Sequence, residues 1–314
     1  MNRLPARSVL AALLVAAIAP LAAAHDDDDD DRHPANTCAS GPAANASRTD
    51  NFSLRARLRI VGLTSDGQLV CFNDRRPQRV RVLGTLSGFT GADSRLIGID
   101  FRPQDGLLYG VGNNGGLYRV DPDTALLSSI GQLTTAPDPA AGAFGVDFNP
   151  AANALRIVAD TGQNLRQPFA NLGTGTPLAP TAVDAALNYT TTATPGPTAT
   201  GIVGAAYTNN DVAAATATTL LVLDRNLDQI VIQSPANAGF LVATGKLGVD
   251  VAGAGFDIYS VLRGDVTVAQ RALASLVIGG TPGLYDIDLF TGHATVRGTI
   301  GAAVMDIAIP RNQY

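Results

Sequence analysis

The sequence L-I-G-I-D-F-R-P (residues 96–103) returns as F-G-V-D-F-N-P (residues 144–150), and this repeat decides the fold. Weaker copies follow at intervals of about 50 residues: V-G-A-A-Y-T-N (203–209), G-F-D-I-Y-S (255–260) and V-M-D-I-A-I-P (304–310). Each copy has the length and apolar content of a short β-strand. Repeats of this period indicate several copies of one small structural unit.

The residues after each copy predict further strands. In the unit that starts at residue 96, the apolar runs 107–111 and 117–120 are separated by N-N-G-G, a tight turn that hairpins favour. The run 126–133 then completes a unit of four strands. The last unit matches it with strands over 272–278, 283–289 and 294–300. Four-stranded units at this spacing are typical of a β-propeller.

The two ends of the repeat region complement each other. The region opens with three strands (59–63, 68–72 and 79–83), and no G-h-D-h strand, where h is apolar, precedes them. Residues 304–309 form a strand of that kind, and no further strands follow it. Pairing it with the first three strands would close the ring. We therefore predict an all-β propeller of about five four-stranded blades over residues 58–310. A sixth blade within residues 173–200 is the main alternative, and a β-sandwich is a weaker one.

The first residues have the three parts of a secretory signal. Arg3 and Arg7 precede an apolar run over residues 8–21, and Ala22 and Ala24 offer small side chains for cleavage. The run of about 14 residues is too short for a permanent membrane span. We predict a signal peptide over residues 1–24 and an exported protein, periplasmic or secreted. Without Arg3 and Arg7, 20 basic residues face 27 acidic ones, and this net charge of −7 argues against a nucleic-acid partner.

Residues 25–57 are predicted to form a disordered arm. The arm opens with six consecutive carboxylates, Asp26 to Asp31, flanked by His25 and His33. Adjacent like charges repel one another and do not pack. A solvated spacer is the favoured interpretation, and a metal-binding tail is the alternative.

The two cysteines, Cys38 and Cys71, both lie after the predicted cleavage site. In an oxidising compartment they can form a disulfide that ties the arm to the first strands. The alternative is that Cys71, within the apolar run 68–72, is simply a small buried side chain.

Several of these motifs together resemble a known family. The runs I-V-G-L-T (60–64), G-I-D-F-R-P (98–103), L-Y-G-V (108–111) and G-L-Y-D-I-D-L (283–289) are similar to the bacterial secreted family catalogued as domain of unknown function 4394. The resemblance covers about residues 58–310 and implies a propeller-like domain outside the cytoplasm. It transfers no catalytic residue.

Common catalytic signatures are absent from the sequence. It contains no G-x-S-x-G, H-E-x-x-H, G-x-x-x-x-G-K or C-x-x-C motif. His293 is the one histidine within the repeat region, and beside a turn it is expected at the surface. A Ser-His-Asp triad or a histidine-rich metal site therefore has little to draw on.

Aligning the repeats places four aspartates at one equivalent position: Asp100, Asp147, Asp257 and Asp306, with Ala206 in the fifth copy. Because side chains alternate along a strand, these carboxylates are expected to face the central channel together. One hypothesis is a Ca²⁺ or similar hard-cation site. The favoured alternative is structural, with each carboxylate accepting backbone N–H bonds from a neighbouring turn and so joining one blade to the next.

The leading functional hypothesis is a non-enzymatic propeller that binds a protein, glycan or surface ligand outside the cytoplasm. It is expected to be a monomer with no certain cofactor. The competing class is a metal-dependent hydrolase or lactonase that uses the channel carboxylates. A purely structural extracellular component is a third possibility.

Overall fold

The computed structural model describes residues 57–190, 196–311 and 313. The chain divides into two units, Met1–Asn36 and Thr37–Tyr314, and every described residue belongs to the second. The predicted signal peptide lies outside the described residues, as does the predicted arm apart from Arg57. The boundaries of both segments therefore stay predictions.

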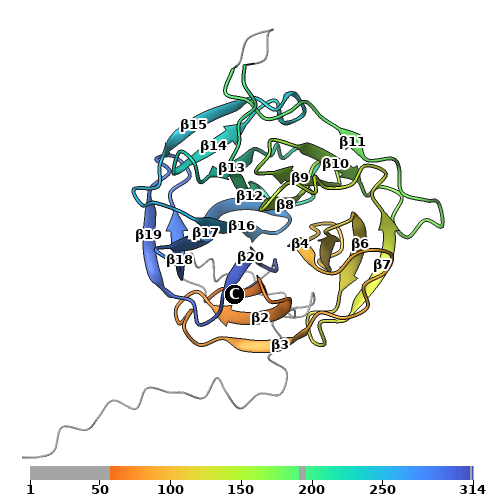
Figure 1. Cartoon of the computed structure of the whole chain (residues 1–314), viewed down its shortest axis with the longest axis horizontal. Helices are drawn as coiled ribbons and strands as arrows, with labels where there is room; N and C mark the ends of the chain where they lie inside the picture. Colours follow the sequence, from red (N-terminus) through yellow and green to blue (C-terminus); the bar gives the residue numbers. More distant parts are fainter. Residues whose placement is uncertain (1–56, 191–195, 312, 314) are drawn as a thin grey trace, which may run out of the picture. The chain divides into compact units, whose positions relative to one another are not determined.

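Five four-stranded antiparallel sheets surround a central axis (Figure 1). From the innermost strand outward, blade 1 is β20 (Val304–Ala308), β1 (Arg59–Thr64), β2 (Gln68–Asn73) and β3 (Arg81–Thr85). Blade 2 is β4 (Leu96–Phe101), β5 (Leu108–Gly112), β6 (Gly116–Val120) and β7 (Leu127–Gln132). Blade 3 is β8 (Phe144–Asn149), β9 (Ala154–Ala159), β10 (Asn164–Pro168) and β11 (Ala182–Val183). Blade 4 is β12 (Ile202–Tyr207), β13 (Leu220–Asp224), β14 (Gln229–Gln233) and β15 (Leu241–Lys246), with the 3-10 helix η2 (Ala236–Ala238) between its last two strands. Blade 5 is β16 (Gly253–Arg263), β17 (Val266–Ile278), β18 (Thr281–Ile287) and β19 (Ala294–Thr299).

The predicted five-bladed propeller is confirmed, and so is its closure. β20 pairs antiparallel with β1, with Gly62 opposite Ile307 and Leu63 opposite Asp306. The side chain of Gln313 continues this seam, because its Oε1 accepts from the backbone N–H of Arg59 (2.6 Å) and its Nε2 donates to the same residue's carbonyl (2.9 Å). The last strand of the chain therefore completes the first blade.

The core is divided among the interfaces between successive blades. Five clusters of buried apolar side chains are present, one at each interface; Leu63 and Ile99 belong to the cluster between blades 1 and 2. Inner strands such as β4 and β8 are buried on both faces as a result, which explains their nearly continuous apolar sequence. Among the described residues, no helix is long and apolar enough to cross a bilayer.

The outermost strands carry a second repeat that the sequence analysis did not use. β3, β7, β15 and β19 each contain a register shift followed by a glycine. In β3, a Cβ on Gly84 would lie 3.0 Å from the carbonyl oxygen of Thr124 and 3.1 Å from the Cβ of Ala125 in blade 2. Glycine at this position lets the next blade's turn pack closely against the edge strand.

Two blades depart from the repeat. In blade 3 the outer strand β11 has only two residues, so the described part of residues 173–200 contains no sixth blade. In blade 5, β16 and β17 are longer than any other strand described. The second strand of this blade was predicted over residues 272–278, whereas β17 begins at Val266 because V-T-V-A-Q continues the ladder with β16.

Candidate functional site

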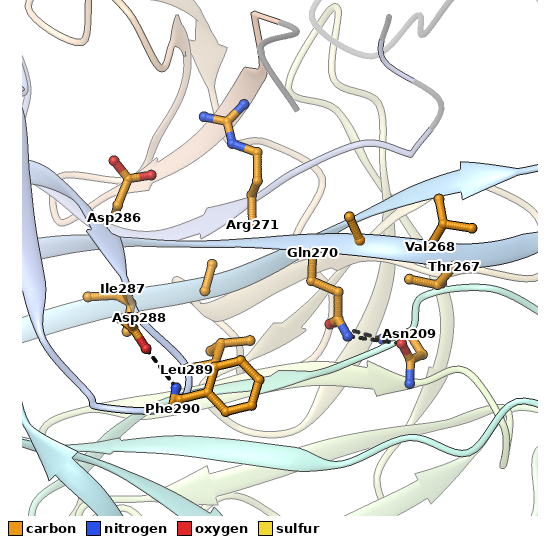
Figure 2. Close-up of a pocket in the computed structure, with 12 residues that line it drawn as sticks. Asn209, Thr267, Val268, Gln270, Arg271, Asp286, Ile287, Asp288, Leu289 and Phe290 are labelled. Carbon is orange, nitrogen blue, oxygen red and sulfur yellow. Dashed lines mark hydrogen bonds between the residues drawn. The ribbon is translucent and has the colours of Figure 1, made fainter. Parts of the chain in front are cut away.

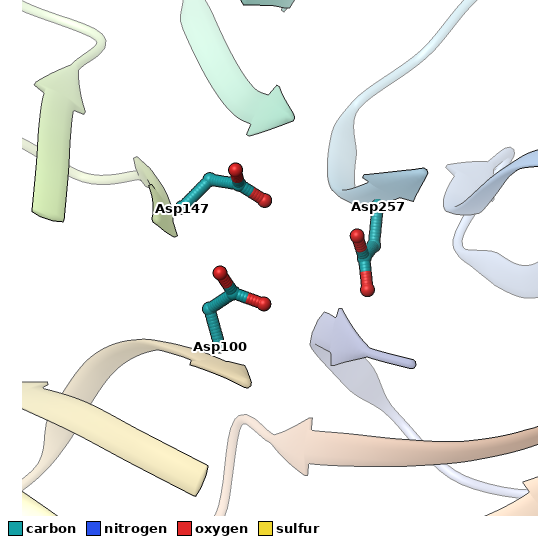
Figure 3. A group of neighbouring side chains, drawn as sticks. All are labelled: Asp100, Asp147 and Asp257. Carbon is teal, nitrogen blue, oxygen red and sulfur yellow. The ribbon is translucent and has the colours of Figure 1, made fainter. Parts of the chain in front are cut away.

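The four aspartates of the repeat converge at the centre of the ring. Asp306, Asp100, Asp147 and Asp257 lie on the innermost strands β20, β4, β8 and β16, and Ala206 occupies the same place on β12. Figure 3 shows the carboxyl groups of Asp100, Asp147 and Asp257 pointing toward one another. All four side chains are buried, with exposed fractions between 1% and 6%.

Each carboxyl group accepts a backbone N–H from the next blade. Asp306 accepts from Ile99 (2.9 Å), Asp100 from Phe148 (2.7 Å), Asp147 from Tyr207 (2.9 Å) and Asp257 from Ile309 (2.6 Å). Asp100, Asp257 and Asp306 also accept the N–H of the residue that follows them, at 2.6, 2.5 and 3.0 Å. The donors lie in or beside the neighbouring innermost strands. The structure therefore contains inter-blade amide bonds, but their donors lie in or directly after innermost strands and not in a neighbouring turn as the structural alternative expected.

Before Asp100, Asp147 and Asp257, a glycine two residues earlier lets the neighbouring innermost strand approach closely, whereas Val304 stands at this place before Asp306. A Cβ on Gly98 would overlap the side chain of Val146 in blade 3. One on Gly255 would overlap the backbone of Asp306 in blade 1. The G-h-D pattern thus combines close approach of two innermost strands with an acceptor that bonds them.

Arg156 is buried near this ring but pairs elsewhere. It lies opposite Asp147 in the register of β8 and β9 and is 1% exposed. Its guanidinium donates to Asp184, Asn164 and Asn237, each at 2.7 Å. In the portion of the chain that the structure describes, no ion pair reaches any of the four channel aspartates.

The electrostatics of the ring follow from this isolation. Burial raises the pKa of Asp100, Asp147 and Asp306 well above the ordinary value, and the neighbouring carboxylates raise it further. Burial also raises the pKa of Asp257 to about 7, although the amides of Ile309 and Ile258 oppose the shift. The neutral carboxyl form is therefore favoured at the centre of the ring.

The same groups have donor atoms that suit a hard cation. Asp100, Asp147 and Asp257 can each direct one oxygen so that all three lie within 4.8 Å of one another. Calcium–oxygen distances are about 2.3–2.6 Å, so one ion could contact all three. Asp306 is not part of this group. A bound cation stays a proposal, as in the sequence analysis.

Blade 5 forms a second candidate site. The β16–β17 hairpin extends past the end of β18, and a pocket of about 510 Å³ lies in the corner (Figure 2). The pocket is lined by part of β17, by the turn after β18 and by one residue of blade 4: Thr267, Val268, Ala269, Gln270, Arg271, Ala272, Asp286, Ile287, Asp288, Leu289, Phe290 and Asn209.

The pocket combines a buried apolar floor with an exposed rim. Ala272 and Ile287 are 4% and 5% exposed, whereas Phe290 is 91% exposed and Val268 is 45% exposed. At one end, the amide of Gln270 donates to Asn209 Oδ1 (2.9 Å) and so joins blade 5 to blade 4 (Figure 2). An apolar floor bordered by a few polar groups is the usual composition of a ligand-binding surface.

None of these pocket residues was predicted from the sequence. The available signal was the strand-forming run V-T-V-A-Q-R after the turn Gly264-Asp265, which has no equivalent in the other repeats. By contrast, His293 is exposed, as expected of a residue beside a turn. Cys71 is buried and disulfide-bonded, but Cys38 lies outside the described residues, so the pairing of the two stays a prediction.

Fold and sites define this chain as a five-bladed β-propeller with a carboxyl-lined centre and one elongated blade. The family model described as "Domain of unknown function (DUF4394)" matches residues 68–308, which is more than half of the chain. The chain belongs to this family. No curated protein matches it.

Several solved structures are similar to this chain at low identity. A nidogen/laminin complex has 12% identity and a TM-score of 0.41, with coverage of 82% of this chain and 100% of that chain. Myxococcus xanthus glutaminyl cyclase has 13% identity and a TM-score of 0.36 (68% and 69%). A putative 6-phosphogluconolactonase from Bacteroides fragilis has 11% identity and a TM-score of 0.35 (80% and 69%). Likenesses of this degree imply nothing about what this chain binds or converts.

Proposed function

We propose that this protein is an exported, monomeric and non-enzymatic binding module whose protein, glycan or surface ligand contacts the elongated blade 5. One observation carries the proposal: blade 5 departs from the repeat by extending β16 and β17, and the extension forms the 510 Å³ pocket beside the exposed ring of Phe290. Features needed to close a ring recur in most blades. The exposed part of the extension occurs in one blade only, so the repeat itself does not need it and it is available for binding.

The burial of the channel carboxyls supports a binding role over the competing hydrolase or lactonase. A catalytic carboxylate must reach its substrate within hydrogen-bond distance. The four channel aspartates are at most 6% exposed, and each is bonded to a backbone amide of the next blade. Their arrangement suits assembly of the ring better than contact with a substrate.

An array of extended peptides and glycans tests the proposal. We expect the purified protein to bind members of one class, and Phe290→Ser to weaken that binding. Val296→Ser is the matched control, because Val296 is 63% exposed on the same blade but does not line the pocket. Equal binding by wild type and Phe290→Ser, or lactone hydrolysis abolished by Asp147→Asn, would contradict the proposal.

A structural Ca²⁺ ion among Asp100, Asp147 and Asp257 is a second and separate proposal. The mutual approach of their oxygens supports it. Calcium would be expected to raise the melting temperature of the wild type, since a ligand that binds only the folded state stabilises it. Asp147→Asn should reduce that increase. If calcium does not change the melting temperature, the proposal fails.

A further inference from the structure

Most of the charged side chains at the blade 5 pocket compensate one another. The guanidinium of Arg271 donates to Asp74 Oδ2 (2.5 Å), and Nη1 of Arg297 lies 3.4 Å from the same oxygen. Arg297 also pairs with both carboxyl oxygens of Asp286, at 2.6 and 2.8 Å. These two arginines and two aspartates form one network without net charge, so neither Arg271 nor Asp286 gives the pocket a charge of its own.

The uncharged polar side chains of the lining are bonded or buried. Nε2 of Gln270 donates to Oδ1 of Asn209 (2.9 Å), and Oε1 of Gln270 accepts the backbone N–H of Asn209 (3.3 Å). Nδ2 of Asn209 donates to the carbonyl of Ala217 (2.6 Å), and the hydroxyl oxygen of Thr267 is buried. A ligand rich in hydroxyl groups would therefore find few free side-chain partners in this pocket.

Asp288 is the carboxylate of the lining that stands outside this network. Its Oδ1 accepts the backbone N–H of Thr291 (3.0 Å) and of Phe290 (2.9 Å). These amides, together with the nearby His293, hold the pKa of the Asp288 carboxyl below its usual value. In the described part of the chain, no basic side chain forms an ion pair with Asp288. The exposed turn therefore presents an uncompensated negative charge at the border of the pocket.

An aromatic ring lies beside this charge on the same turn. Phe290 lines the pocket and is 91% exposed (Figure 2), and the floor of the pocket contains the buried Ala272 and Ile287. The face of an aromatic ring attracts cations but offers no conventional hydrogen-bonding group. Phe290 and Asp288 together therefore favour a cation whose own surface is apolar.

The kind of cation follows from the hydrogen-bonding groups that it carries. A primary ammonium has three N–H donors, and each of them needs an acceptor or must keep its water. A quaternary ammonium has no N–H, and its alkyl groups gain from contact with an aromatic ring and an apolar floor. One uncompensated carboxylate beside a phenyl ring suits the quaternary group better.

We propose that the blade 5 pocket binds a quaternary ammonium group of its ligand, with the cation between the ring of Phe290 and the carboxylate of Asp288. The apolar part of the ligand lies against Ala272 and Ile287. The proposal deepens the proposed function and rests on it, because it assigns a chemical class to the ligand of the same pocket. A quaternary ammonium is carried by lipid headgroups at a surface and by free small molecules.

A titration with choline tests this assignment. The probe is added to the isotope-labelled full chain, and the backbone amide signals of Phe290 and Thr291 are followed by NMR, because both amides donate to Asp288. Both signals should shift and reach saturation. The uncharged isostere of choline, in which a tert-butyl group replaces the trimethylammonium group, should bind about fivefold more weakly. Asp288→Asn should weaken choline binding about threefold, as expected for an exposed ion pair.

Two further variants separate the contributions at the site. Phe290→Leu keeps an apolar side chain but removes the aromatic face, and it should weaken choline binding about threefold. Asp121→Asn is the matched control, since Asp121 caps the turn of blade 2 that corresponds to the turn of Asp288. This control should leave choline binding unchanged.

Vesicles of phosphatidylcholine distinguish the two sources of the cation. If the ligand is a lipid headgroup, the protein sediments with the vesicles and choline releases it; a protein that binds choline and not the vesicles recognises a free small molecule. The inference is overturned if choline shifts neither amide signal, or if the uncharged isostere binds equally well. Either result together with an array ligand whose binding needs Phe290 would overturn the inference and leave the proposed function standing.

Discussion

The centre of the ring and the tip of blade 5 differ in almost every physical respect. The channel aspartates recur in four blades, are buried, and are bonded to backbone amides of the next blade. The β16–β17 extension occurs in one blade, lies beside the exposed Phe290, exposes Val268, and continues past the point where its pairing with β18 ends. Buried features that recur in most blades, such as the channel aspartates, belong to the packing of the ring. The exposed residues at the tip of blade 5 occur in one blade only, and the ring does not depend on them.

This difference implies that the two regions respond to mutation in different ways. Changes at the centre should alter the free energy of unfolding, because buried polar groups depend on their partners. Changes at the tip of blade 5 should alter binding and leave stability nearly unchanged, since substitutions at exposed positions seldom matter to folding.

The largest effect is expected from Gly255→Ala on β16. The added methyl group would overlap the backbone of Asp306, which cannot move without disturbing the closure of the ring. We expect a loss of about 3 kcal/mol in the free energy of unfolding, measured by urea denaturation. Gly253→Ala on the same strand is the control, because its nearest neighbour would lie 3.9 Å away. Equal losses in the two variants would contradict the role given to the G-h-D glycine.

Asp100→Asn should have the next largest effect. Both carboxyl oxygens accept backbone amides, so the asparagine NH₂ group must face one of these donors. A loss of about 2 kcal/mol in unfolding free energy is expected. Asp147 has a single such bond, to Tyr207, so Asp147→Asn can keep it and should cost less. If the order of the two losses were reversed, the bonding pattern would not explain the stability.

The unfolding free energy should depend on pH by a smaller amount than these mutations change it, and it should decrease as the pH rises. Burial raises the pKa of Asp257 to about 7 in the folded state, above its unfolded value near 4, so the folded protein binds more protons between these limits. This contribution to stability is complete below pH 4 and is lost as the pH rises through 7. Thermal unfolding between pH 6 and 8 should show a decrease of about 1 kcal/mol from this group. Stability that rises over this range in the presence of Ca²⁺ would instead favour a bound cation.

The smallest effect on stability is expected from Phe290→Ser. The ring of Phe290 is 91% exposed, so its loss should change the unfolding free energy by less than about 0.5 kcal/mol. The same variant should weaken binding of the ligand class found on the array about fivefold, since exposed aromatic residues are often major contributors to an interface. A large loss of stability with unchanged binding would reverse the roles given to the two regions.

Much of the fold could be predicted because each blade buries the same positions. The period of Gly98, Asp100 and their copies set the number of blades, and the incomplete units at the two ends indicated how the ring closes. Whether the aspartates bond to amides or to a cation could not be predicted, because either partner stabilises the same buried carboxyl group. The amide bonds became visible only with the positions of Phe148 and Ile309.

The pocket could not be predicted from the repeat, because it arises where the repeat is broken. The run V-T-V-A-Q-R has the composition of a strand, but the pocket beside it depends on where β18 ends and turns at Asp288. The short β11 of blade 3 escaped prediction for a related reason: alanine, glycine and threonine over residues 173–200 have no clear period.

Backbone hydrogen exchange of the unliganded protein tests the contrast between the two regions most directly. The amides of Ile99, Phe148, Tyr207 and Ile309, which donate to the channel carboxyls, should exchange only through global unfolding. The amides of the exposed residues Val268 and Phe290 at the tip of blade 5 should exchange far faster. Rapid exchange of the four channel amides, or equal protection at Val268 and Phe290, would contradict the account.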